Sequence, residues 1–329
     1  MPMKEQISGI HHITAVASST AENLTFYETI LGLRLVKQTV NFDDPFTYHL
    51  YYGDAQGAPG TILTFFPWER LSRGEVGTGM VTAIAFGVPR ASMPFWQKRL
   101  QTAGLSLQTQ ERFGDPVMAL SDRDGLPIEL VGMDHPPETT AWNGSPIPEE
   151  HAISGFHSAT ATLQAYEGMQ SLLQMDLGMR RHLQEGNRHR FISAGQEAPG
   201  HFFDIVVDPD ASPGRPGSGT VHHIAWRTPS ERTQAWWQSR LRQAGRLVTA
   251  VRDRKYFRSI YFHSPGGVLF EIATDPPGFD VDESMDHLGE FLMLPDQYEP
   301  MRPAIENQLP SLDRNASRQS PVYASGTSG

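Results

Sequence analysis

Short apolar runs, partly alternating with polar residues, recur along most of the chain and are separated by turn residues. A period of two predicts strands, whereas apolar residues three and four positions apart predict helices. The first round opens with a strand at residues 11–16. A helix then begins near Ser18 and runs to about Ile30, with Gly32 after its end, because hydroxyl residues start helices and glycine closes them. Further strands are predicted at residues 33–41, 47–52 and 61–66.

The same order of elements is repeated three more times. Residues 95–104 and 236–245 have the same amino acid at several equivalent positions. Each segment is followed by a predicted strand that carries a glutamate, Glu129 or Glu271. The repeat is too long for a solenoid unit, and four copies indicate that one module was duplicated and the resulting pair was duplicated again. The sequence therefore predicts an α+β fold of four βαβββ modules. The remaining predicted elements are strands at 80–88, 117–121, 128–131, 155–160 and 202–207, helices at 91–103 and 166–177, and a fourth module over 221–273.

A proline-rich, polar segment between Pro136 and Pro148 separates the first two modules from the last two, and we interpret it as a linker. Near the C-terminus a helical piece is predicted around residues 302–307. Residues 316–329 have little to bury and are expected to be disordered. The expected parts are a first domain of two modules at 1–135, a linker at 136–150, a second domain of two modules at 151–275 and an extension at 276–329.

A pair of adjacent histidines occurs twice, each time inside an apolar, strand-like run. His11 and His12 lie in the first predicted strand, and His222 and His223 lie in the first strand of the fourth module. Glu271 lies in the last strand of that module. Two imidazoles and one carboxylate leave positions on a metal open for substrate and oxygen. We therefore predict a mononuclear metal site made of His12, His223 and Glu271.

Composition narrows the possible classes of function. The formal net charge of -10 argues against a nucleic-acid binder and disfavours anionic membrane surfaces. No apolar run approaches the roughly 20 residues that span a bilayer, and the first residues lack the apolar core of a signal peptide. The chain contains no cysteine, so disulfides, thiolate ligands and cysteine nucleophiles are excluded. A cytoplasmic enzyme fits these features.

Four modules with metal ligands on first and last strands resemble the vicinal oxygen chelate superfamily, which includes glyoxalase I and the extradiol dioxygenases. A closer resemblance is to the ring-cleaving dioxygenases that act on hydroquinones, the group of 2,6-dichlorohydroquinone dioxygenase. It covers residues 9–274 and continues into the extension. One of the shared sequence segments, the basic residues 186–190, is expected to form a turn between strands. The other shared segments are residues 35–41, 48–54, 57–61 and 264–271.

The resemblance implies Fe(II) held by His12, His223 and Glu271, and Mn(II) suits the same ligands. His157 competes for the role of first ligand. It begins the third module, from which many two-domain extradiol enzymes take that ligand. The hydroquinone group uses the histidine of the first module, so we favour His12. This choice implies that the first module pairs with the fourth. The second and third modules would then form an incomplete second pocket with Glu129 and His157.

Four further residues are candidates for catalysis. Tyr261 lies one strand before the carboxylate ligand, as in extradiol dioxygenases, and its phenol can exchange a proton with a substrate oxygen. Arg254 resembles a pocket arginine of the hydroquinone group and could stabilise an oxyanion. His11 and His222 would face away from the metal unless a bulge turns them toward the pocket rim. The resemblance implies that both line the pocket, and it makes Thr14 a weaker candidate.

The resulting hypothesis is an Fe(II)-dependent dioxygenase that inserts O2 into a hydroquinone-type ring and opens it. A small aromatic substrate and O2 are the expected partners. Extradiol cleavage of a catechol is the alternative within the same chemistry. A glyoxalase-type isomerase or a thiol transferase is the alternative on the same scaffold, and such enzymes often hold the metal with a second carboxylate. A homo-oligomer is expected, as for most soluble assemblies.

Overall fold

Four modules of one design make up the structure, a computed structural model that describes residues 7–137, 141–193 and 200–312. Each module runs strand, helix, strand, strand, strand, and its first strand lies parallel to its last. The predicted α+β fold is thereby confirmed. The modules are β1 (Ile10–Ala17), α1 (Thr20–Leu24), β2 (Arg34–Asn41), β3 (Asp44–Gly53) and β4 (Ile62–Pro67); β5 (Met80–Pro89), α2 (Met93–Thr102), β6 (Gln108–Arg112), β7 (Asp115–Ser121) and β8 (Pro127–Met133); β9 (Phe156–Leu163), α3 (Glu167–Ser171), β10 (Arg180–Glu185), β11 (Arg188–Ile192) and β12 (Phe202–Val207); and β13 (Val221–Thr228), α4 (Glu231–Gln243), β14 (Arg252–Asp253), β15 (Phe257–His263) and β16 (Leu269–Pro277).

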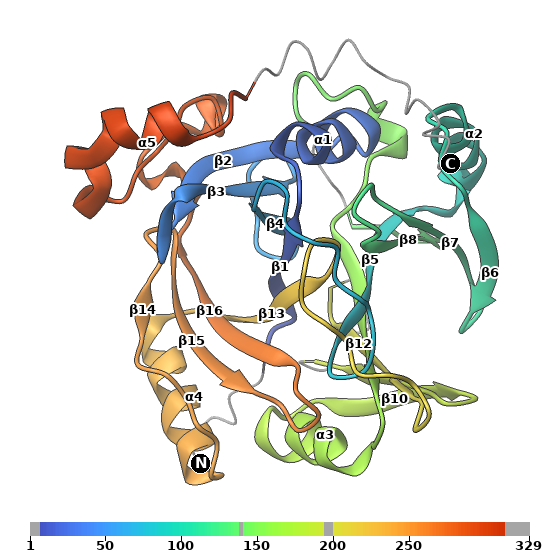
Figure 1. Cartoon of the computed structure of the whole chain (residues 1–329). Coiled ribbons are helices and arrows are strands. Elements are labelled where there is room, and N and C mark those ends of the chain that lie inside the picture. Colours follow the sequence, from blue (N-terminus) through green and yellow to red (C-terminus); the bar gives the residue numbers. More distant parts are fainter. Residues whose placement is uncertain (1–6, 138–140, 194–199, 313–329) are drawn as a thin grey trace.

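Each sheet combines one module from the first half of the chain with one from the second half (Figure 1). One eight-stranded sheet has the order β14-β15-β16-β13-β1-β4-β3-β2 and joins the fourth module to the first. The other has the order β10-β11-β12-β9-β5-β8-β7-β6 and joins the third to the second. The pairing of the first module with the fourth, which the choice of His12 implied, is thus observed. The division into consecutive domains at 1–135 and 151–275 stays a prediction, because each sheet takes one module from each half of the chain.

The first helix shows how the local sequence determines its ends. The Ser19 side chain accepts a hydrogen bond from the Glu22 backbone N–H at the start of α1. The helix continues through a π-helical turn, Thr25–Ile30, and the chain then leaves it at Gly32 with a φ of 75°. Glycine adopts that left-handed conformation without steric cost. The predicted end near residue 30 is therefore correct.

The two sheets pack on each other through aromatic side chains. Trp226 of β13 lies edge-on against Phe203 of β12, with 5.4 Å between ring centroids, and it also contacts Phe270 of β16. All three side chains are fully buried. The sheets therefore share one apolar core, and the module that contributes most to the candidate site is anchored in it. Within the described ranges, no helix combines the length and apolar character needed to cross a membrane.

The basic segment at residues 186–190 differs from the expectation. Only its first residues form a turn, and β11 begins at Arg188. Arg190 is buried and forms two hydrogen bonds to the carboxylate of Asp204, which lies opposite it on β12. The prediction of a turn is correct for residues 186 and 187 and wrong for residues 188–190. An acidic partner on the neighbouring strand compensates the charge of Arg190.

The extension after the fourth module packs along β2 and β3 (Figure 1). Its helix α5 (Arg302–Gln308) confirms the piece predicted near residues 302–307. Leu288, Leu294 and Ile305 are buried, so the extension covers part of the core. The expectation of disorder at residues 316–329 falls outside the described residues.

A buried lysine fastens this extension to the first module. Lys37 of β2 is fully buried, and its ammonium lies 2.6 Å from a carboxylate oxygen of Asp282 and 2.5 Å from one of Glu283. Tyr256, from the turn before β15, donates its hydroxyl proton to Asp282. Three separate segments therefore meet at one largely buried charge cluster. A charge in such a place is stable only while its partners are present.

We predict that Lys37→Met destabilises the protein by about 3–5 kcal/mol, because it leaves the buried carboxylate of Glu283 without the Lys37 counter-charge. Methionine retains the aliphatic stem, so the effect reports charge rather than volume. Arg215→Met is the matched control. Its ion pair with Glu75 is solvent-exposed and should contribute less than about 1 kcal/mol. Urea denaturation measures both variants, and equal unfolding midpoints for the two would contradict the prediction.

Candidate metal centre and active-site cavity

The antiparallel pairing of β1 with β13 creates a local twofold relation between the first and fourth modules. Ile13 lies opposite Ile224, and on either side His12 pairs with Ala225 and Thr14 with His223. The two histidines thus take equivalent places on the two strands. Glu271 pairs with Ala225 from the other side, on β16. Three side chains that are far apart in sequence are brought to one point.

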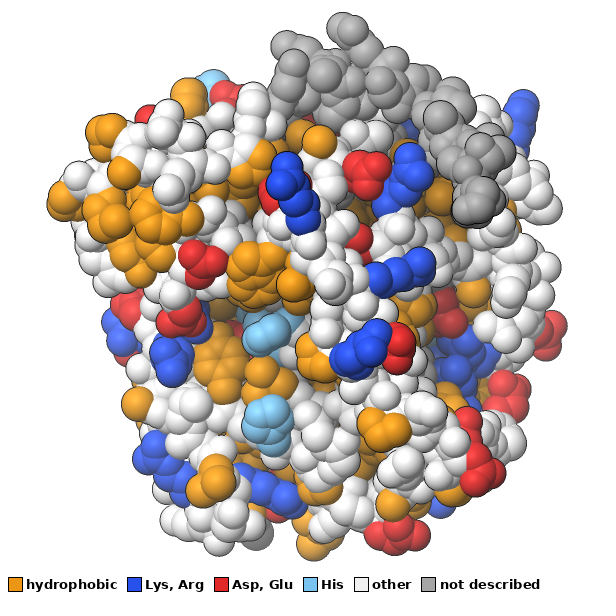
Figure 2. All heavy atoms as spheres, viewed as in Figure 1, with side chains coloured by type: hydrophobic (Ala, Val, Ile, Leu, Met, Phe, Trp, Pro, Cys, Tyr) orange, Lys and Arg blue, Asp and Glu red, His pale blue; other side chains and the backbone are white. Residues whose placement is uncertain are grey.

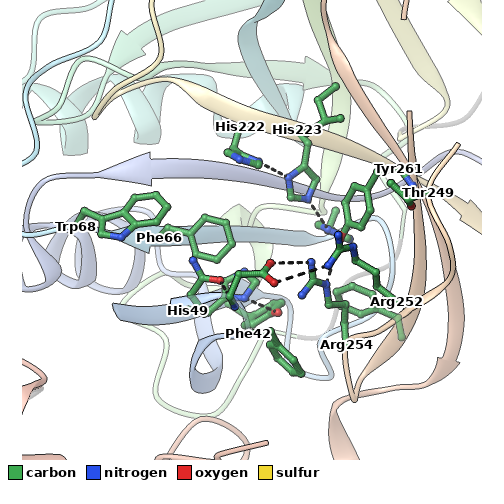
Figure 3. A pocket seen from close by; sticks show the side chains of 16 residues that line it. Phe42, His49, Phe66, Trp68, His222, His223, Thr249, Arg252, Arg254 and Tyr261 are labelled. Atoms are coloured by element: carbon green, nitrogen blue, oxygen red, sulfur yellow. Dashed lines mark hydrogen bonds and ion pairs between the residues drawn. The ribbon is translucent and has the colours of Figure 1, made fainter. Parts of the chain in front are cut away.

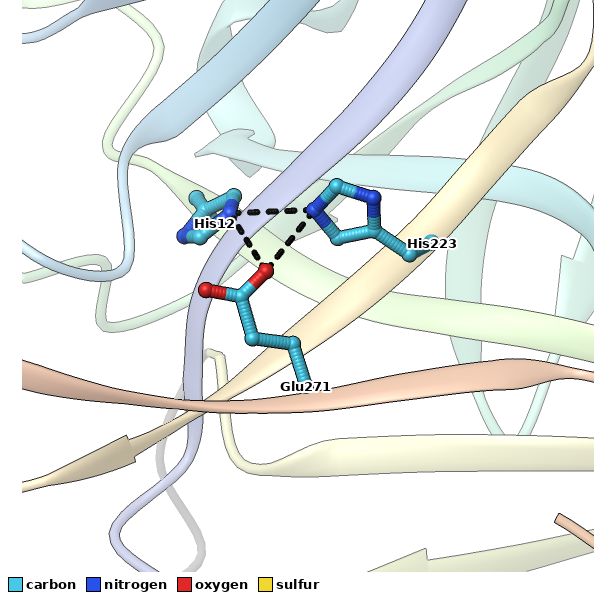
Figure 4. A group of neighbouring side chains, drawn as sticks. All are labelled: His12, His223 and Glu271. Carbon is cyan, nitrogen blue, oxygen red and sulfur yellow. Dashed lines mark hydrogen bonds and ion pairs between the residues drawn. The ribbon is translucent and has the colours of Figure 1, made fainter. Parts of the chain in front are cut away.

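The metal-facing atoms of this trio converge closely (Figure 4). Nε2 of His12 lies 3.4 Å from Oε2 of Glu271 and 3.3 Å from Nε2 of His223, and the latter nitrogen lies 2.9 Å from the same Oε2. The ligand atoms lie within 4.8 Å of one another, and all three residues are buried. Among the described residues, this is the group of histidine and acidic side chains close enough to hold a metal.

The two carboxylate oxygens of Glu271 have different surroundings. Ser259 donates a hydrogen bond of 2.5 Å to Oε1 of Glu271, whereas Oε2 is buried and, among the described residues, has only the Nε2 atoms of His223 and His12 as polar neighbours, at 2.9 and 3.4 Å. Its position between two imidazole nitrogens fits a divalent cation.

The protonation states also suit a metal. Burial raises the pKa of the Glu271 carboxyl, but His12 and His223 outweigh burial and hold the pKa well below its usual range. Burial lowers the pKa of His223, although Glu271 opposes the shift. An ionised carboxylate and neutral imidazoles are the forms that bind metal ions.

Each of the two ligand histidines contacts the histidine that precedes it. The Nδ1 atoms of His11 and His12 are 2.9 Å apart, and those of His222 and His223 are 2.8 Å apart. The β1–β13 register shifts by one residue at His11 and again at His222, so both are bulge positions. A bulge turns a side chain that would otherwise face away, which explains how adjacent residues share one site.

These Nδ1 contacts determine where the ligand histidines carry their protons. If Nε2 of His12 and His223 faces a metal, then Nδ1 carries the proton and donates it to the preceding histidine. Burial lowers the pKa of His222 to about 4 and that of His11 well below its usual value, so both remain neutral acceptors. His222 lines the cavity described next, whereas His11 is buried behind His12 against the ring of Phe257.

A cavity of about 350 Å³ lies over the trio, and aromatic side chains form much of its wall (Figure 3). This volume is at the small end for ligand pockets and suits a compound of one ring. On the face drawn in Figure 2, histidine side chains lie near the middle among hydrophobic ones, with acidic and basic side chains interspersed around them. The aromatic residues of the lining are Phe42, Tyr51, Phe66, Trp68, Phe257 and Tyr261.

Tyr261 and Arg254 lie together on the wall of this cavity (Figure 3). Nε of Arg254 donates to the Tyr261 hydroxyl at 3.3 Å, and its terminal nitrogen lies 3.4 Å from Asp43. Burial raises the pKa of Tyr261, so its phenol is protonated at neutral pH. Burial lowers the pKa of Arg254, but Tyr261 and Asp43 reverse the shift and keep the guanidinium charged. The wall therefore offers one proton donor and one fixed cation.

Sequence reasoning named His12, His11 and Thr14 of the first module but missed the residues that its strand β3 contributes. His49 and Tyr51 of β3 line the cavity, and Tyr51 lies opposite Thr64 on β4. Tyr261 has the same relation to Glu271. Tyr51 is thus the first-module counterpart of Tyr261, and Thr64 is the counterpart of Glu271. The internal repeat contained this signal, but only the strand register makes the equivalence explicit.

His157 lies in the other sheet, at the equivalent β9–β5 pairing. There Ser158 pairs with Ala85 as His12 pairs with Ala225. His157 is thus the counterpart of His11 rather than of His12, and its Nδ1 lies 3.1 Å from the Ser158 hydroxyl. Glu129, the counterpart of Glu271, is held by two hydrogen bonds from Arg112, of 2.6 and 2.7 Å. The structure does not bring His157 to the trio.

Comparison with known proteins agrees with this geometry. Residues 9–130 match the family model of the glyoxalase/bleomycin resistance protein/dioxygenase superfamily. MhqO of Bacillus subtilis, assigned by name to the ring-cleaving dioxygenases, is 45% identical over 93% of this chain and 97% of its own length. A chlorohydroquinone/hydroquinone 1,2-dioxygenase of Sphingobium indicum is 33% identical over 91% of this chain and 95% of its own.

A crystal structure from Bacillus subtilis, likewise assigned to the dioxygenases, superposes with a TM-score of 0.90 at 45% identity. It covers 94% of this chain and 98% of that one. The chain belongs to the glyoxalase/dioxygenase, or vicinal oxygen chelate, superfamily. Within it, its full-length relatives support an enzyme of the dioxygenase class.

We predict that His12→Ala abolishes stoichiometric metal binding, because two ligands on the fourth module are left to hold the ion. His157→Ala should bind as much iron as the wild type, since its ring lies in the other sheet. Both proteins are loaded with Fe(II) under anaerobic conditions, desalted and analysed for iron per chain by mass spectrometry. Full iron content in His12→Ala together with loss in His157→Ala would reverse the assignment of the first ligand.

Proposed function

We propose that this protein is an Fe(II)-dependent ring-cleaving dioxygenase that inserts O2 into a hydroquinone-type aromatic compound. The observation that carries the proposal is the buried trio of His12, His223 and Glu271. The trio lies at a cavity that is lined by aromatic side chains and has the size of a compound with one ring. The names of the full-length relatives support it. The expected partners are a small aromatic substrate and O2. The cytoplasmic location and homo-oligomeric state expected from the sequence stay predictions.

His12, His223 and Glu271 would hold the metal, and Fe(II) is the ion we propose, with Mn(II) as the alternative for the same ligands. When bound, the ion supplies a common site for a substrate oxygen and O2 and a path for electrons between them. The protein orients both reactants and keeps water away. Phe257, which lies 4.8 Å from the His12 ring between centroids, and the other aromatic side chains shape this dry space.

In this proposal, residues of the cavity wall transfer protons and stabilise negative charge. Tyr261 is protonated and can donate to, or exchange a proton with, a substrate oxygen. Arg254 stabilises negative charge on the ring or its oxygens and orients the Tyr261 hydroxyl. His222 reaches the cavity, and because its Nδ1 accepts from His223, its neutral ring carries the proton on Nε2 and can donate it. His11 acts indirectly, by holding the tautomer of His12.

The ligand set disfavours the isomerase or transferase alternative. Such enzymes often take a second carboxylate, and the twofold relation indicates where it would stand in the first module. That position is Thr64, whose hydroxyl donates to Thr14 and whose side chain carries no charge. Catechol cleavage uses the same chemistry and differs only in the substrate, so the panel described next distinguishes it.

The Fe(II)-loaded protein is expected to consume oxygen when hydroquinones are added, and Glu271→Gln should lose this activity because a neutral amide cannot replace the anionic ligand. Glu129→Gln, at the equivalent place in the other sheet, is the matched control and should remain active. An oxygen electrode follows uptake with a panel of hydroquinones and catechols. Uptake with catechols alone would shift the substrate class, and no uptake by iron-loaded wild type would contradict the proposal.

Tyr261→Phe should lower kcat by about 100-fold, the lower range for loss of a general acid or base. Iron content should be unchanged, because the phenol is not a ligand. Tyr52→Phe is the control, since the Tyr52 hydroxyl donates to Asn23 away from the cavity. Steady-state oxygen uptake and metal analysis are measured on both variants. A Tyr261→Phe enzyme with wild-type kcat would remove the proton-transfer role.

A further inference from the structure

Four polar side chains of the first module form an unbroken line of hydrogen bonds that ends at the metal centre. The Tyr51 hydroxyl lies 2.8 Å from Nδ1 of His49, and Nε2 of His49 lies 2.8 Å from Oγ1 of Thr64. The Thr64 hydroxyl donates to Oγ1 of Thr14 at 2.9 Å. Oγ1 of Thr14 lies 3.0 Å from Nε2 of His223, the nitrogen that faces the metal site.

The direction of this chain follows from counting protons. A hydroxyl has one proton, and Thr64 uses its proton on Thr14. His49 must therefore donate from Nε2 to Thr64, which leaves Nδ1 of His49 to accept the proton of Tyr51. Because Oγ1 of Thr14 already accepts from Thr64, the Thr14 proton is directed onward, to Nε2 of His223. Every donor in the line points the same way.

Burial keeps the line in one arrangement. Thr14 and Thr64 are fully buried, Tyr51 is 1% exposed and His49 is 9% exposed. Water therefore offers few competing partners, and hydrogen bonds in such an environment reinforce one another. Burial also raises the pKa of Tyr51 and lowers that of His49, so the groups are neutral. A neutral, dry chain with fixed direction behaves as one unit.

We propose that Tyr51, His49 and Thr64 are positioning residues that commit the Thr14 hydroxyl to donate a hydrogen bond to an ionised phenolic oxygen bound at the metal centre. The inference deepens the proposed function and rests on its metal site. Once a metal takes the Nε2 lone pair of His223, the Thr14 proton needs another acceptor. An ionised phenolic oxygen can only accept, whereas a neutral hydroxyl would present a competing proton. The site therefore favours aromatic ligands in their ionised form.

A substitution at Thr64 tests the hydrogen-bond chain without changing the lining of the cavity. It is fully buried, does not line the cavity and contacts the metal-facing His223 only through Thr14. Thr64→Val preserves shape and removes the hydroxyl, and Thr64→Ser restores the hydroxyl. Thr39→Val is the matched control, because Thr39 is equally buried on β2 of the same sheet and its hydroxyl has no hydrogen-bond partner in the described structure.

The first experiment titrates Zn(II)-loaded protein with 4-nitrocatechol, whose visible spectrum reports ionisation. Thr64→Val should bind the ionised probe about tenfold more weakly, the effect of losing one well-directed hydrogen bond to a charged group. Thr64→Ser and Thr39→Val should bind as the wild type does. Equal affinity in Thr64→Val and wild type would overturn the inference, and so would a zinc-loaded wild type that does not bind the probe.

The second experiment needs neither metal nor activity. Nitrogen-15 NMR of the His49 ring should show the proton on Nε2 and a bare Nδ1 in the wild type. A proton on Nδ1 would reverse the chain and overturn the inference. Failure of the proposed function is distinguishable, because it appears as absent oxygen uptake while the probe affinities and the His49 tautomer follow the expected pattern.

Discussion

The antiparallel pairing of β1 with β13 is the constraint on which the candidate site depends. It joins the first module to the last and sets His12 and His223 symmetrically about Ile13 and Ile224. Neither module alone supplies the candidate metal-binding trio, because the fourth supplies His223 and Glu271 and the first supplies His12. A one-residue bulge on each strand then brings a second histidine into contact with each of these histidines. Ligand geometry and ligand tautomer thus come from the same pair of strands.

The second sheet uses the same framework without a metal centre. Its strands pair in the same register, but Ser158 and Ala83 stand where the first sheet has its ligand histidines. The equivalent carboxylate of Glu129 is compensated by the guanidinium of Arg112. A buried carboxylate needs a counter-charge. A fixed arginine provides it in one sheet, and a divalent ion would provide it in the other, which leaves that site open to exchange ligands.

The cavity is equally a product of both modules. The turn between β2 and β3 contributes Phe42 and Asp43, and the turn between β14 and β15 contributes Arg254. An ion pair between Asp43 and Arg254 joins the two turns across the wall. Lys37, on the strand that leads to the first turn, ties it to the C-terminal extension. The shape of the substrate space is therefore coupled to the stability of the whole sheet.

Local chemistry in the sequence predicted the modules and the candidate ligands, and the family resemblance favoured His12 over His157. Apolar periodicity, helix caps and the repeated His-His pair are visible without coordinates, because they depend on neighbours along the chain. The strand register decided the rest. It made Tyr51 the counterpart of Tyr261, placed His157 at the position of His11, and buried Arg190 in a strand where a turn was expected. These features depend on partners from distant strands, and only tertiary structure specifies which residues become neighbours.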